Sequence, residues 1–402
     1  MIYDKALEYV NEIPGGHGDD PQYLKKVLDI LQWKQRGKII HIAGTNGKGS
    51  TGFFMDRLLQ KKGKTTVHLS SPHLLDYRER FLYNGELIEE ELFIEIVEKI
   101  RRKEKEFPRR PYYFEMALLI GLLLSQIKSP DYLLLETGIG GKEDATNFVG
   151  KTSLAVITTV AKDHENILGN SLEEIARHKA GIIKYKVPTI SLRHTEEIDE
   201  IIMEKAKKEK SPLLFVDGKD WTITCGKDFT TIERDGKIWE SSMCGSHQGT
   251  NLSLAVVAVE SLEGEFTEKR TRIIGAFPGR MERLRKNPLF YIDGAHNEEG
   301  ERAVLQSLSS MEYDRLYLIV GKMRDKTMDL HPLTDLAEKI ILTKIQDERA
   351  EQFTEGEGAI VTKNPREAVE KALELATEKD LILALGSIYL IGEIKEIMEN
   401  EY

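Results

Sequence analysis

The chain has 402 residues, of which 40% are hydrophobic and 31% are charged, a composition typical of folded soluble proteins rather than disordered ones. At roughly 150 residues per domain, this length predicts two or three domains. The formal net charge of -10 argues against general nucleic-acid binding, which needs basic surface to neutralise phosphates.

The N-terminal segment lacks the basic start and apolar run of a signal peptide. The strongest apolar run, Ala117–Leu124, is far shorter than the roughly 20 residues that cross a bilayer. The two cysteines, Cys225 and Cys244, form no metal-binding pair and are expected to be reduced. We therefore expect a cytoplasmic protein that contacts neither membranes nor nucleic acids.

Through the first half of the chain, short apolar runs rich in Ile, Val and Leu alternate with helical patterns. The apolar runs predict buried strands at Lys38–Ala43, Thr65–Ser70, Tyr132–Thr137, Ser153–Thr159 and Val187–Leu192. The intervening patterns predict helices at Lys48–Lys62, Phe114–Lys128 and Ser171–Ile183. Strands that are apolar at every position are typical of a parallel sheet covered on both faces, so the sequence predicts an α/β fold with crossover helices.

Residues 213–243 do not continue this alternation of apolar runs and helical patterns. Phe229–Arg234 and Lys237–Ser241 flank Asp235-Gly236, a strong hairpin signal, and predict a small antiparallel piece. The elements expected after it are a helix at Gln248–Leu262 and strands at Phe290–Asp293, Arg315–Gly321, Lys339–Thr343 and Leu381–Gly386. Because Pro278-Gly279 punctuates the chain between the two α/β series, we expect an N-terminal domain at 1–276, a linker at 277–281 and a C-terminal domain at 282–402.

A glycine-rich loop connects the first predicted strand to the helix that follows it. Its residues are Gly44-Thr45-Asn46-Gly47-Lys48-Gly49-Ser50. Glycines in this context let backbone N–H groups approach phosphate oxygens, and the helix N-terminus adds the positive end of its dipole. The loop departs from the common GxxxxGK[ST] pattern, because Ile42 occupies its first glycine position and Gly49 follows the lysine. We interpret it as a variant phosphate loop that binds ATP, with Lys48 at the β- and γ-phosphates; the alternative is a glycine-rich turn with a surface lysine.

Further motifs follow in a fixed order along the chain. They are Ser71-Pro72-His73-Leu74 with Glu79-Arg80-Phe81, Glu136–Gly141, Asp144–Asn147, Asp163-His164, Leu168-Gly169, Lys179–Lys184, His247-Gln248 with Asn251, Pro278-Gly279-Arg280, Asp293–Asn297, Asp325-Lys326 and Gly386–Leu390. Together with GTNGKGS at 44–50, this set resembles the folylpolyglutamate and dihydrofolate synthases of the Mur ligase superfamily. The resemblance implies a two-lobed fold with an ATP-binding N-terminal lobe and a Rossmann-like C-terminal lobe that supplies the glutamate site. The chain departs from the family pattern at Lys142-Glu143, at Ala161-Lys162 and in the short segment 213–243.

The resemblance also implies two magnesium sites. Ser71, Glu136 and His164 match the family's ligands, and each follows a predicted strand, which places it at the carboxyl edge of the sheet. Taken alone, each side chain is also consistent with an ordinary surface or turn residue. Lys179 matches a lysine that is carbamoylated in the family, and a carbamate presents two anionic oxygens to a metal. The alternative for Lys179 is a place on a solvated helix face.

Four more residues match family positions around the nucleotide. Asn251, Arg280 and Asp293 match nucleotide contacts, and His296 matches a catalytic position in the same turn as Asp293. The alternative for Asp293 and His296 is a strand-to-helix cap, because Asp favours caps.

By this resemblance, the chain is expected to be an ATP- and Mg²⁺-dependent ligase that activates a carboxylate as an acyl phosphate and joins it to L-glutamate. The expected substrate is a folate, extended at its γ-carboxylate, and also dihydropteroate; we expect a monomer. Two alternatives stay open: a Mur-type ligase that acts on another carboxylate, and a P-loop nucleotide-binding regulator without ligase chemistry.

Overall fold

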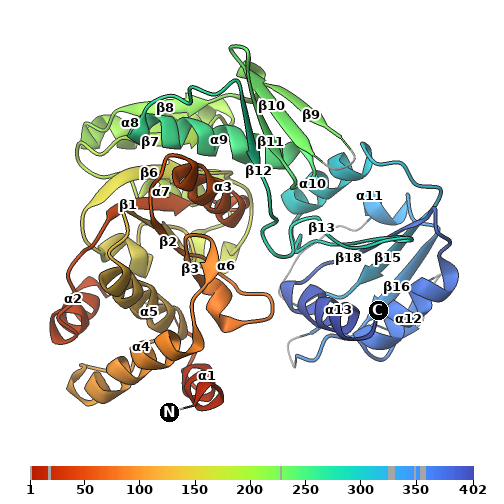
Figure 1. Ribbon diagram of the computed structural model, residues 1–402, viewed down its shortest axis with the longest axis horizontal. Coiled ribbons are helices and arrows are strands. Elements are labelled where there is room, and N and C mark those ends of the chain that lie inside the picture. The colour runs from red at the N-terminus through yellow and green to blue at the C-terminus, as the bar shows by residue number, and fades with distance from the viewer. Residues whose placement is uncertain (1, 17–19, 227–228, 325–330, 348–349, 354–358) are drawn as a thin grey trace. The chain divides into compact units, whose positions relative to one another are not determined.

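The computed structural model describes residues 2–402 except 17–19, 227–228, 325–330, 348–349 and 354–358 (Figure 1). The chain forms two compact units. The first contains Met1–Trp221 and Asn251–Thr267, and the second contains Thr222–Thr250 and Glu268–Tyr402. The expected linker at 277–281 lies within the second unit. No described helix combines the length and the apolar character needed to cross a bilayer.

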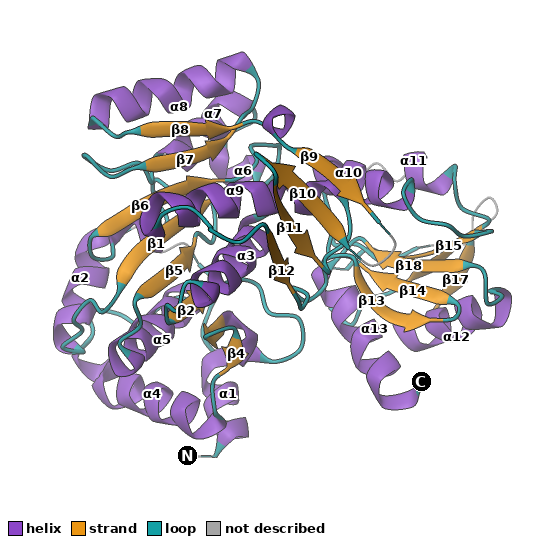
Figure 2. Ribbon diagram, turned by 45° about the horizontal axis from the view of Figure 1, so that its top comes forward, coloured by secondary structure: helices purple, strands orange, loops and turns teal. Residues whose placement is uncertain are grey.

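The first unit is built on an eight-stranded sheet with the order β4-β3-β2-β5-β1-β6-β7-β8 (Figures 1 and 2). Its strands are β1 (Lys38–Ala43), β2 (Thr66–Leu69), β3 (Phe81–Tyr83), β4 (Glu86–Leu87), β5 (Tyr132–Glu136), β6 (Thr152–Ile157), β7 (Thr189–Leu192) and β8 (Leu213–Val216). The six neighbouring strands β2-β5-β1-β6-β7-β8 run parallel, which confirms the α/β prediction.

Two features of this sheet differ from the prediction. β3 and β4 pair antiparallel at one edge and were not foreseen. β8 was expected to belong to the small antiparallel piece, because residues 213–243 break the alternating rhythm. It instead pairs with β7 in parallel and extends the large sheet.

Helices cover both faces of this sheet. They are α1 (Tyr3–Asn11), α2 (Pro21–Ile30), α3 (Lys48–Lys61), α4 (Glu90–Lys103), α5 (Tyr113–Lys128), α6 (Glu165–Leu168), α7 (Leu172–Ala180), α8 (Glu196–Glu209) and α9 (Ser246–Glu263). Of α9, the part from Asn251 onward belongs to this unit. Short 3₁₀ turns lie at Tyr77–Arg80, Glu104–Glu106, Ala145–Phe148 and Gly218–Asp220. α5 is apolar around its whole circumference and is buried from Glu115 to Ser125.

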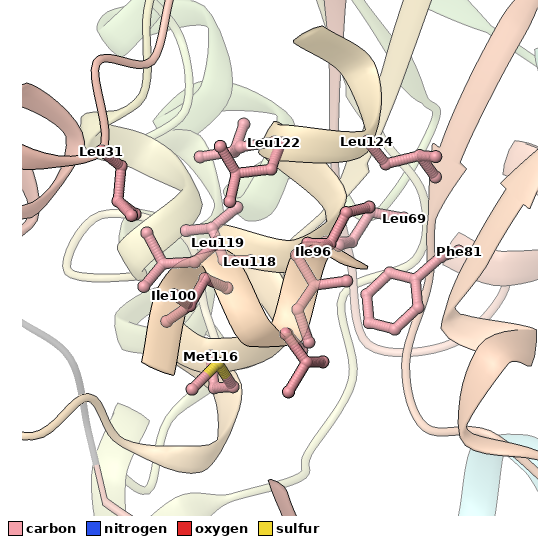
Figure 3. Close-up of a cluster of buried hydrophobic side chains, with 14 of the residues drawn as sticks. Leu31, Leu69, Phe81, Ile96, Ile100, Met116, Leu118, Leu119, Leu122 and Leu124 are labelled. Carbon is pink, nitrogen blue, oxygen red and sulfur yellow. The ribbon is translucent and has the colours of Figure 1, made fainter. Parts of the chain in front are cut away.

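Two successive residues of β2 show which helix covers which face of the sheet. Leu69 packs with α5 side chains such as Leu118 and Leu122 in the core cluster drawn in Figure 3. His68 points the other way, toward α3: a Cβ atom added to Gly52 would lie 2.4 Å from His68 Nε2. Because successive side chains of a strand point to opposite faces, the sheet is covered by α5 on one side and by α3 on the other.

The second unit contains two sheets. The four-stranded sheet has the order β12-β11-β10-β9, with β9 (Thr222–Cys225), β10 (Thr230–Arg234), β11 (Lys237–Ser241) and β12 (Arg270–Ile273). The predicted hairpin is confirmed: β10 and β11 pair antiparallel, and both Asp235 and Gly236 have positive φ, as a two-residue hairpin turn requires. β12 adds to β11 in parallel, so the sheet is mixed rather than purely antiparallel.

The six-stranded sheet has the order β13-β14-β18-β15-β16-β17. Its strands are β13 (Glu282–Lys286), β14 (Leu289–Ile292), β15 (Leu316–Val320), β16 (Lys339–Thr343), β17 (Ile360–Thr362) and β18 (Leu381–Leu385), and its helices are α10 (Glu298–Leu308), α11 (His331–Thr334), α12 (Pro365–Leu375) and α13 (Ile388–Glu401). All neighbours except β13 and β14 are parallel. The carboxyl ends of β14 to β17 therefore lie at one edge of the sheet.

Candidate active site

The glycine-rich loop forms the strand, loop and helix arrangement that the sequence predicted. β1 ends at Ala43, and α3 begins at Lys48 with Gly47 as its N-cap in a left-handed conformation (φ 83°). The loop is held by the segment that follows β6: the N–H of Thr45 donates to the carbonyl oxygen of Thr159 at 2.7 Å, and the N–H of Asn46 donates to its hydroxyl at 3.1 Å. The N-terminal N–H groups of α3 therefore start from a fixed turn.

Two glycines of the loop are required by close neighbours. A Cβ atom on Gly44 would lie 1.7 Å from Thr158 Oγ1, and one on Gly47 would lie 2.4 Å from Asn251 Oδ1. The second distance also shows that the side chain of Asn251, which is 4% exposed, lies directly on the loop. The structure thus brings Asn251 from α9 to the loop, although the two are separated by some 200 residues in sequence.

The ammonium group of Lys48 folds back over the loop. Lys48 Nζ donates to the carbonyl oxygens of Gly44 and Thr45, each at 3.1 Å, and lies 3.8 Å from Glu136 Oε1. The side chains of Lys48 and Glu136 are 15% and 4% exposed. This arrangement excludes the alternative of a lysine on the open surface and places one cation and one carboxylate beside the loop.

Glu136 and Ser71 come together at the carboxyl edge of the sheet, as their positions after β5 and β2 predict. The N–H of Ser71 donates to Glu136 Oε2 at 3.3 Å. The carboxylate of Glu136 is buried, and Ser71, whose backbone N–H contacts it, carries a hydroxyl; both groups are hard oxygen donors of the kind Mg²⁺ uses. Because Mg²⁺ is usually bound by one or two carboxylates together with substrate phosphates and water, this pair fits one such ion.

His164 has a different setting. It is the N-cap of the short helix α6, it has φ 52°, and its side chain is exposed, with Nε2 4.0 Å from Asp163 Oδ2. Within the described ranges, no three His, Cys, Asp or Glu side chains group closely enough to hold a metal ion. The structure therefore joins Ser71 to Glu136 and leaves His164 on the loop after β6, where its role as a ligand stays a prediction.

Lys179 is buried, with only 3% of the residue exposed, so a place on a solvated helix face is wrong for it. It lies in the last turn of α7, and this turn packs on the loop that follows Glu136. The N–H of Lys142 donates to the carbonyl oxygen of His178 at 2.8 Å, and a Cβ atom on Gly141 would lie 3.2 Å from the Lys179 carbonyl oxygen. The backbone of Lys179 and the glycine loop after β5 are therefore neighbours.

A buried polar chain fixes the loop after β5, and sequence reasoning had assigned it no role. Asp144 accepts hydrogen bonds from the N–H groups of Gly138 and Ile139 at 2.9 and 3.0 Å and from the hydroxyl of Thr146. Because that hydroxyl donates to Asp144, the 2.8 Å contact with His41 Nε2 requires the histidine to donate. Burial raises the pKa of Asp144, and burial followed by the charge of Lys184 lowers the pKa of His41 to about 3.

The second unit holds a separate group of predicted residues around the turn after β14. Asp293 accepts hydrogen bonds from the N–H groups of Met281 at 2.7 Å and Ala295 at 2.8 Å. Arg280 Nη1 donates to the carbonyl oxygen of Gly279 at 3.0 Å. A Cβ atom on Gly294 would lie 2.4 Å from the same Arg280 Nη1. Asp293 thus clamps the segment that carries Arg280 onto the turn.

His296 lies in the same turn, with Nδ1 2.8 Å from the carbonyl oxygen of Gly294. The N-cap of α10 is Asn297, which accepts the N–H of Gly300 at 2.9 Å, so neither Asp293 nor His296 caps this helix. Asp325-Lys326, another motif singled out in the sequence, lies outside the described residues.

Comparison with known protein families accounts for both parts of the chain. Residues 42–259 match the Mur ligase middle domain. The chain belongs to the Mur ligase family. Residues 279–388 match a second profile, described as the Mur ligase glutamate ligase domain. The first match contains the phosphate loop and Glu136, and the second contains Arg280 and Asp293.

Among relatives of this family member, the dihydrofolate synthase/folylpolyglutamate synthase of Bacillus subtilis is 29% identical over 388 residues, which cover 89% of this chain and 90% of the relative. The folylpolyglutamate synthase of Lacticaseibacillus casei is 28% identical over 350 residues, 81% of each chain. These similarities confirm the resemblance that the ordered motifs indicated.

Solved structures share the fold. The apo form of L. casei FPGS has a TM-score of 0.85 at 22% identity and covers 100% of both chains. The folylpolyglutamate synthase of Thermotoga maritima has a TM-score of 0.80 at 27% identity and covers 100% of this chain and 97% of its own. Both support the two-lobed Mur ligase architecture.

Proposed function

We propose that the chain is an ATP-dependent ligase that joins L-glutamate to the γ-carboxylate of a folate, and that it also converts dihydropteroate to dihydrofolate. The observation that carries this proposal is the pairing of Lys48 with Glu136 beside a phosphate loop, in a chain that matches both Mur ligase profiles. The similarity to the B. subtilis dihydrofolate synthase/folylpolyglutamate synthase over 90% of that protein's length supports the folate substrates.

The proposed reaction has two steps. A carboxylate oxygen of the folate attacks the γ-phosphorus of ATP, the bond to the β–γ bridging oxygen breaks, and ADP leaves. The amine of glutamate then attacks the acyl phosphate carbon, inorganic phosphate leaves with the bonding electrons, and the nitrogen loses a proton. Positioning and charge stabilisation supply most of the rate in such transfers.

The residues of the first unit suit the phosphoryl transfer. The N–H groups from Gly44 to Ser50 bind the phosphates, and the ammonium of Lys48 stabilises the negative charge on the γ-phosphoryl group during its transfer. Thr158 and Asn251 lie against the loop so closely that each leaves room only for glycine at the adjacent position, and the Thr158 hydroxyl donates to the carbonyl oxygen of Asn46. Ser71 and Glu136 would hold Mg²⁺, which neutralises charge on the phosphate oxygens when bound, and His164 is proposed as a further ligand.

Lys179 is proposed to act as a carbamate. Its amine would attack CO₂, forming an N–C bond and releasing one proton, and the product is an anion suited to a second Mg²⁺. Burial supports this role, since a modified lysine in the interior is shielded from water that would reverse the reaction. In the second unit, Arg280 and Asp293 are proposed nucleotide contacts and His296 a catalytic group. We further propose that the enzyme is a cytoplasmic monomer with its domain boundary at 277–281.

The deciding experiment measures ADP release with ATP, Mg²⁺ and L-glutamate, in the presence of tetrahydrofolate or dihydropteroate. Turnover that depends on either acceptor supports the proposal and identifies which activities are present. ADP release with a different carboxylate substrate alone would identify a ligase outside folate chemistry. Nucleotide binding without acceptor-dependent turnover would identify a regulator.

A further inference from the structure

Three neighbouring parallel strands of the second unit are each followed by a basic side chain. Arg324 follows β15, Lys344 follows β16 directly and Lys363 follows β17 directly. These three residues line one cavity of about 560 Å³ at the carboxyl edge of the sheet. This volume lies within the range of about 300–1,000 Å³ that small-molecule sites have, and the carboxyl edge is where open α/β sheets bind ligands.

The cavity is positive in an acidic protein. Its described lining has these three cations and one carboxylate, Asp347, whereas the whole chain has a net charge of -10. Asn364 also lines it and is the N-cap of α12, so the positive end of this helix dipole faces the same region. Arg324 Nε donates to the carbonyl oxygen of Ala350 at 3.1 Å, which fixes the guanidinium against the wall. The chemistry predicts an anionic ligand.

The cavity shares its sheet edge with the turn that holds Asp293. In the strand order, β16 is three steps from β14, through β18 and β15. At about 4.8 Å per strand, Lys344 is roughly 14 Å along this edge from the end of β14. A ligand that begins at the Asp293 turn and carries regularly spaced negative charges could therefore extend over the cations.

We propose that this cavity, termed the basic edge cavity, binds the γ-glutamyl tail of the folate substrate. This inference rests on the proposed function. Each reaction cycle adds one glutamate and hence one α-carboxylate to the acceptor, so a longer acceptor offers more charges to Arg324, Lys344 and Lys363. The cavity makes affinity rise with tail length, which keeps a partly extended acceptor bound in preference to a new one.

Kinetics with acceptors of different length tests the proposal. The double variant Lys344→Gln/Lys363→Gln removes two charges and leaves Arg324 in place. The control Lys286→Gln/Lys379→Gln removes two exposed lysines at the opposite edge of the same sheet, where β13 ends and β18 begins. We expect KM for a pentaglutamylated folate to rise on the order of tenfold in the cavity variant, with less than a twofold change for the monoglutamate and no change in the control.

KM for free glutamate separates two sources of the same carboxylate chemistry. A rise in KM for glutamate that is equal at every tail length would assign the cavity to the incoming amino acid and overturn the proposal. An equal rise in KM for the one-glutamate and the five-glutamate acceptors in both double variants would show that general electrostatics causes the effect. This result would also overturn the proposal.

Direct binding keeps this inference separate from the ligase assignment. Calorimetry with penta-γ-glutamate, without folate or ATP, should show binding to the wild type that weakens in the cavity variant and at high salt, but not in the control variant. Ligase activity without this length dependence overturns the tail site alone. Peptide binding in a protein that is inactive on every folate supports the cavity and overturns the proposed function instead.

Discussion

His194 Nε2 lies 2.9 Å from the carbonyl oxygen of Thr158. Because a carbonyl oxygen only accepts, the histidine donates this hydrogen bond. The hydroxyl of Thr158 in turn donates to the carbonyl oxygen of Asn46 at 2.7 Å. Asp199 Oδ1 accepts the N–H of His194 at 3.1 Å, which fixes the loop that carries the imidazole. His194 therefore acts on the phosphate loop through Thr158.

This chain predicts a specific effect on nucleotide affinity. His194→Leu should weaken binding of ATP about fivefold, since a neutral hydrogen bond contributes about 1 kcal/mol. His194→Gln should retain most of the affinity, because its amide nitrogen can occupy the position of Nε2. Calorimetric titration of all three proteins with a non-hydrolysable ATP analogue measures this. Equal losses in the Leu and Gln variants would contradict a positioning role.

Lys48 is expected to be essential for turnover and unnecessary for folding. Lys48→Ala should lower kcat on the order of a thousandfold, because one close charge on a transferring phosphoryl group contributes several kcal/mol to the barrier. Lys61→Ala, at the exposed end of the same helix α3, is the control and should retain activity. Near-normal turnover of the Lys48 variant with an intact thermal transition would remove the phosphate-loop assignment.

Gly47 and Gly63 separate two costs of adding a side chain. Both have positive φ, at 83° and 73°, but only at Gly47 would the new Cβ meet another atom, Asn251 Oδ1. Gly63→Ala should therefore cost about 1 kcal/mol of unfolding free energy, and Gly47→Ala clearly more. Urea denaturation measures both. Asn251→Ala should be less destabilising in the Gly47→Ala background than alone, and strict additivity would argue against the contact.

Acid should destabilise the protein through His41. Its pKa is lowered from 6.5 to about 3, mainly by burial, so between these values the unfolded chain binds a proton that the folded chain does not. The free energy of unfolding should fall as pH drops below 6.5, by up to about 1.4 kcal/mol per pH unit from this group. Unfolding curves at pH 6.5 and 5.0 give the slope of the free energy of unfolding against pH. This slope should be smaller in His41→Gln than in the wild type, by about the contribution of one bound proton. An unchanged slope would mean that His41 titrates normally.

The carbamate proposed for Lys179 makes a chemical prediction. Lys179→Ala should nearly abolish activity, and short carboxylic acids should partly restore it by occupying the vacated space. Arg177→Ala, on the exposed side of the same helix, is the control and should retain activity. A ¹³C resonance of a carbamate after addition of ¹³C-bicarbonate should appear in the wild type and the control only. Its absence from a fully active wild type would refute the modification.

Local pattern was sufficient for the central elements. The runs at Lys38–Ala43 and Lys339–Thr343 were predicted with the bounds that β1 and β16 have, because both are short runs rich in isoleucine. β1 is buried from Ile39 to Ala43, whereas β16 is only partly buried. The carboxyl-edge argument also anticipated that Ser71 and Glu136 meet, since the ends of parallel strands converge without any knowledge of side-chain contacts.

Sequence could not reveal features that depend on distant partners. β4 is two exposed residues long, and β8 is only partly buried, so neither has the apolar signature of a central strand. Lys179 is buried, and its backbone lies beside the glycine loop at Gly141, a neighbour that the helix pattern of α7 does not contain. The hydrogen bond between His41 and Thr146 likewise depends on a tertiary arrangement, because the two residues are 105 positions apart.

The short strands β3 and β4 have a consequence for how the protein behaves among its own copies. β3 pairs with β2, whose residues Thr66–Leu69 are all buried and which would otherwise form this margin of the large sheet, and β4 pairs with β3. The margin is instead β4, which offers two exposed residues, one of them the carboxylate Glu86. Such a short, charged edge strand gives another chain little backbone to pair with, so the hairpin protects this edge of the large sheet against strand-to-strand aggregation.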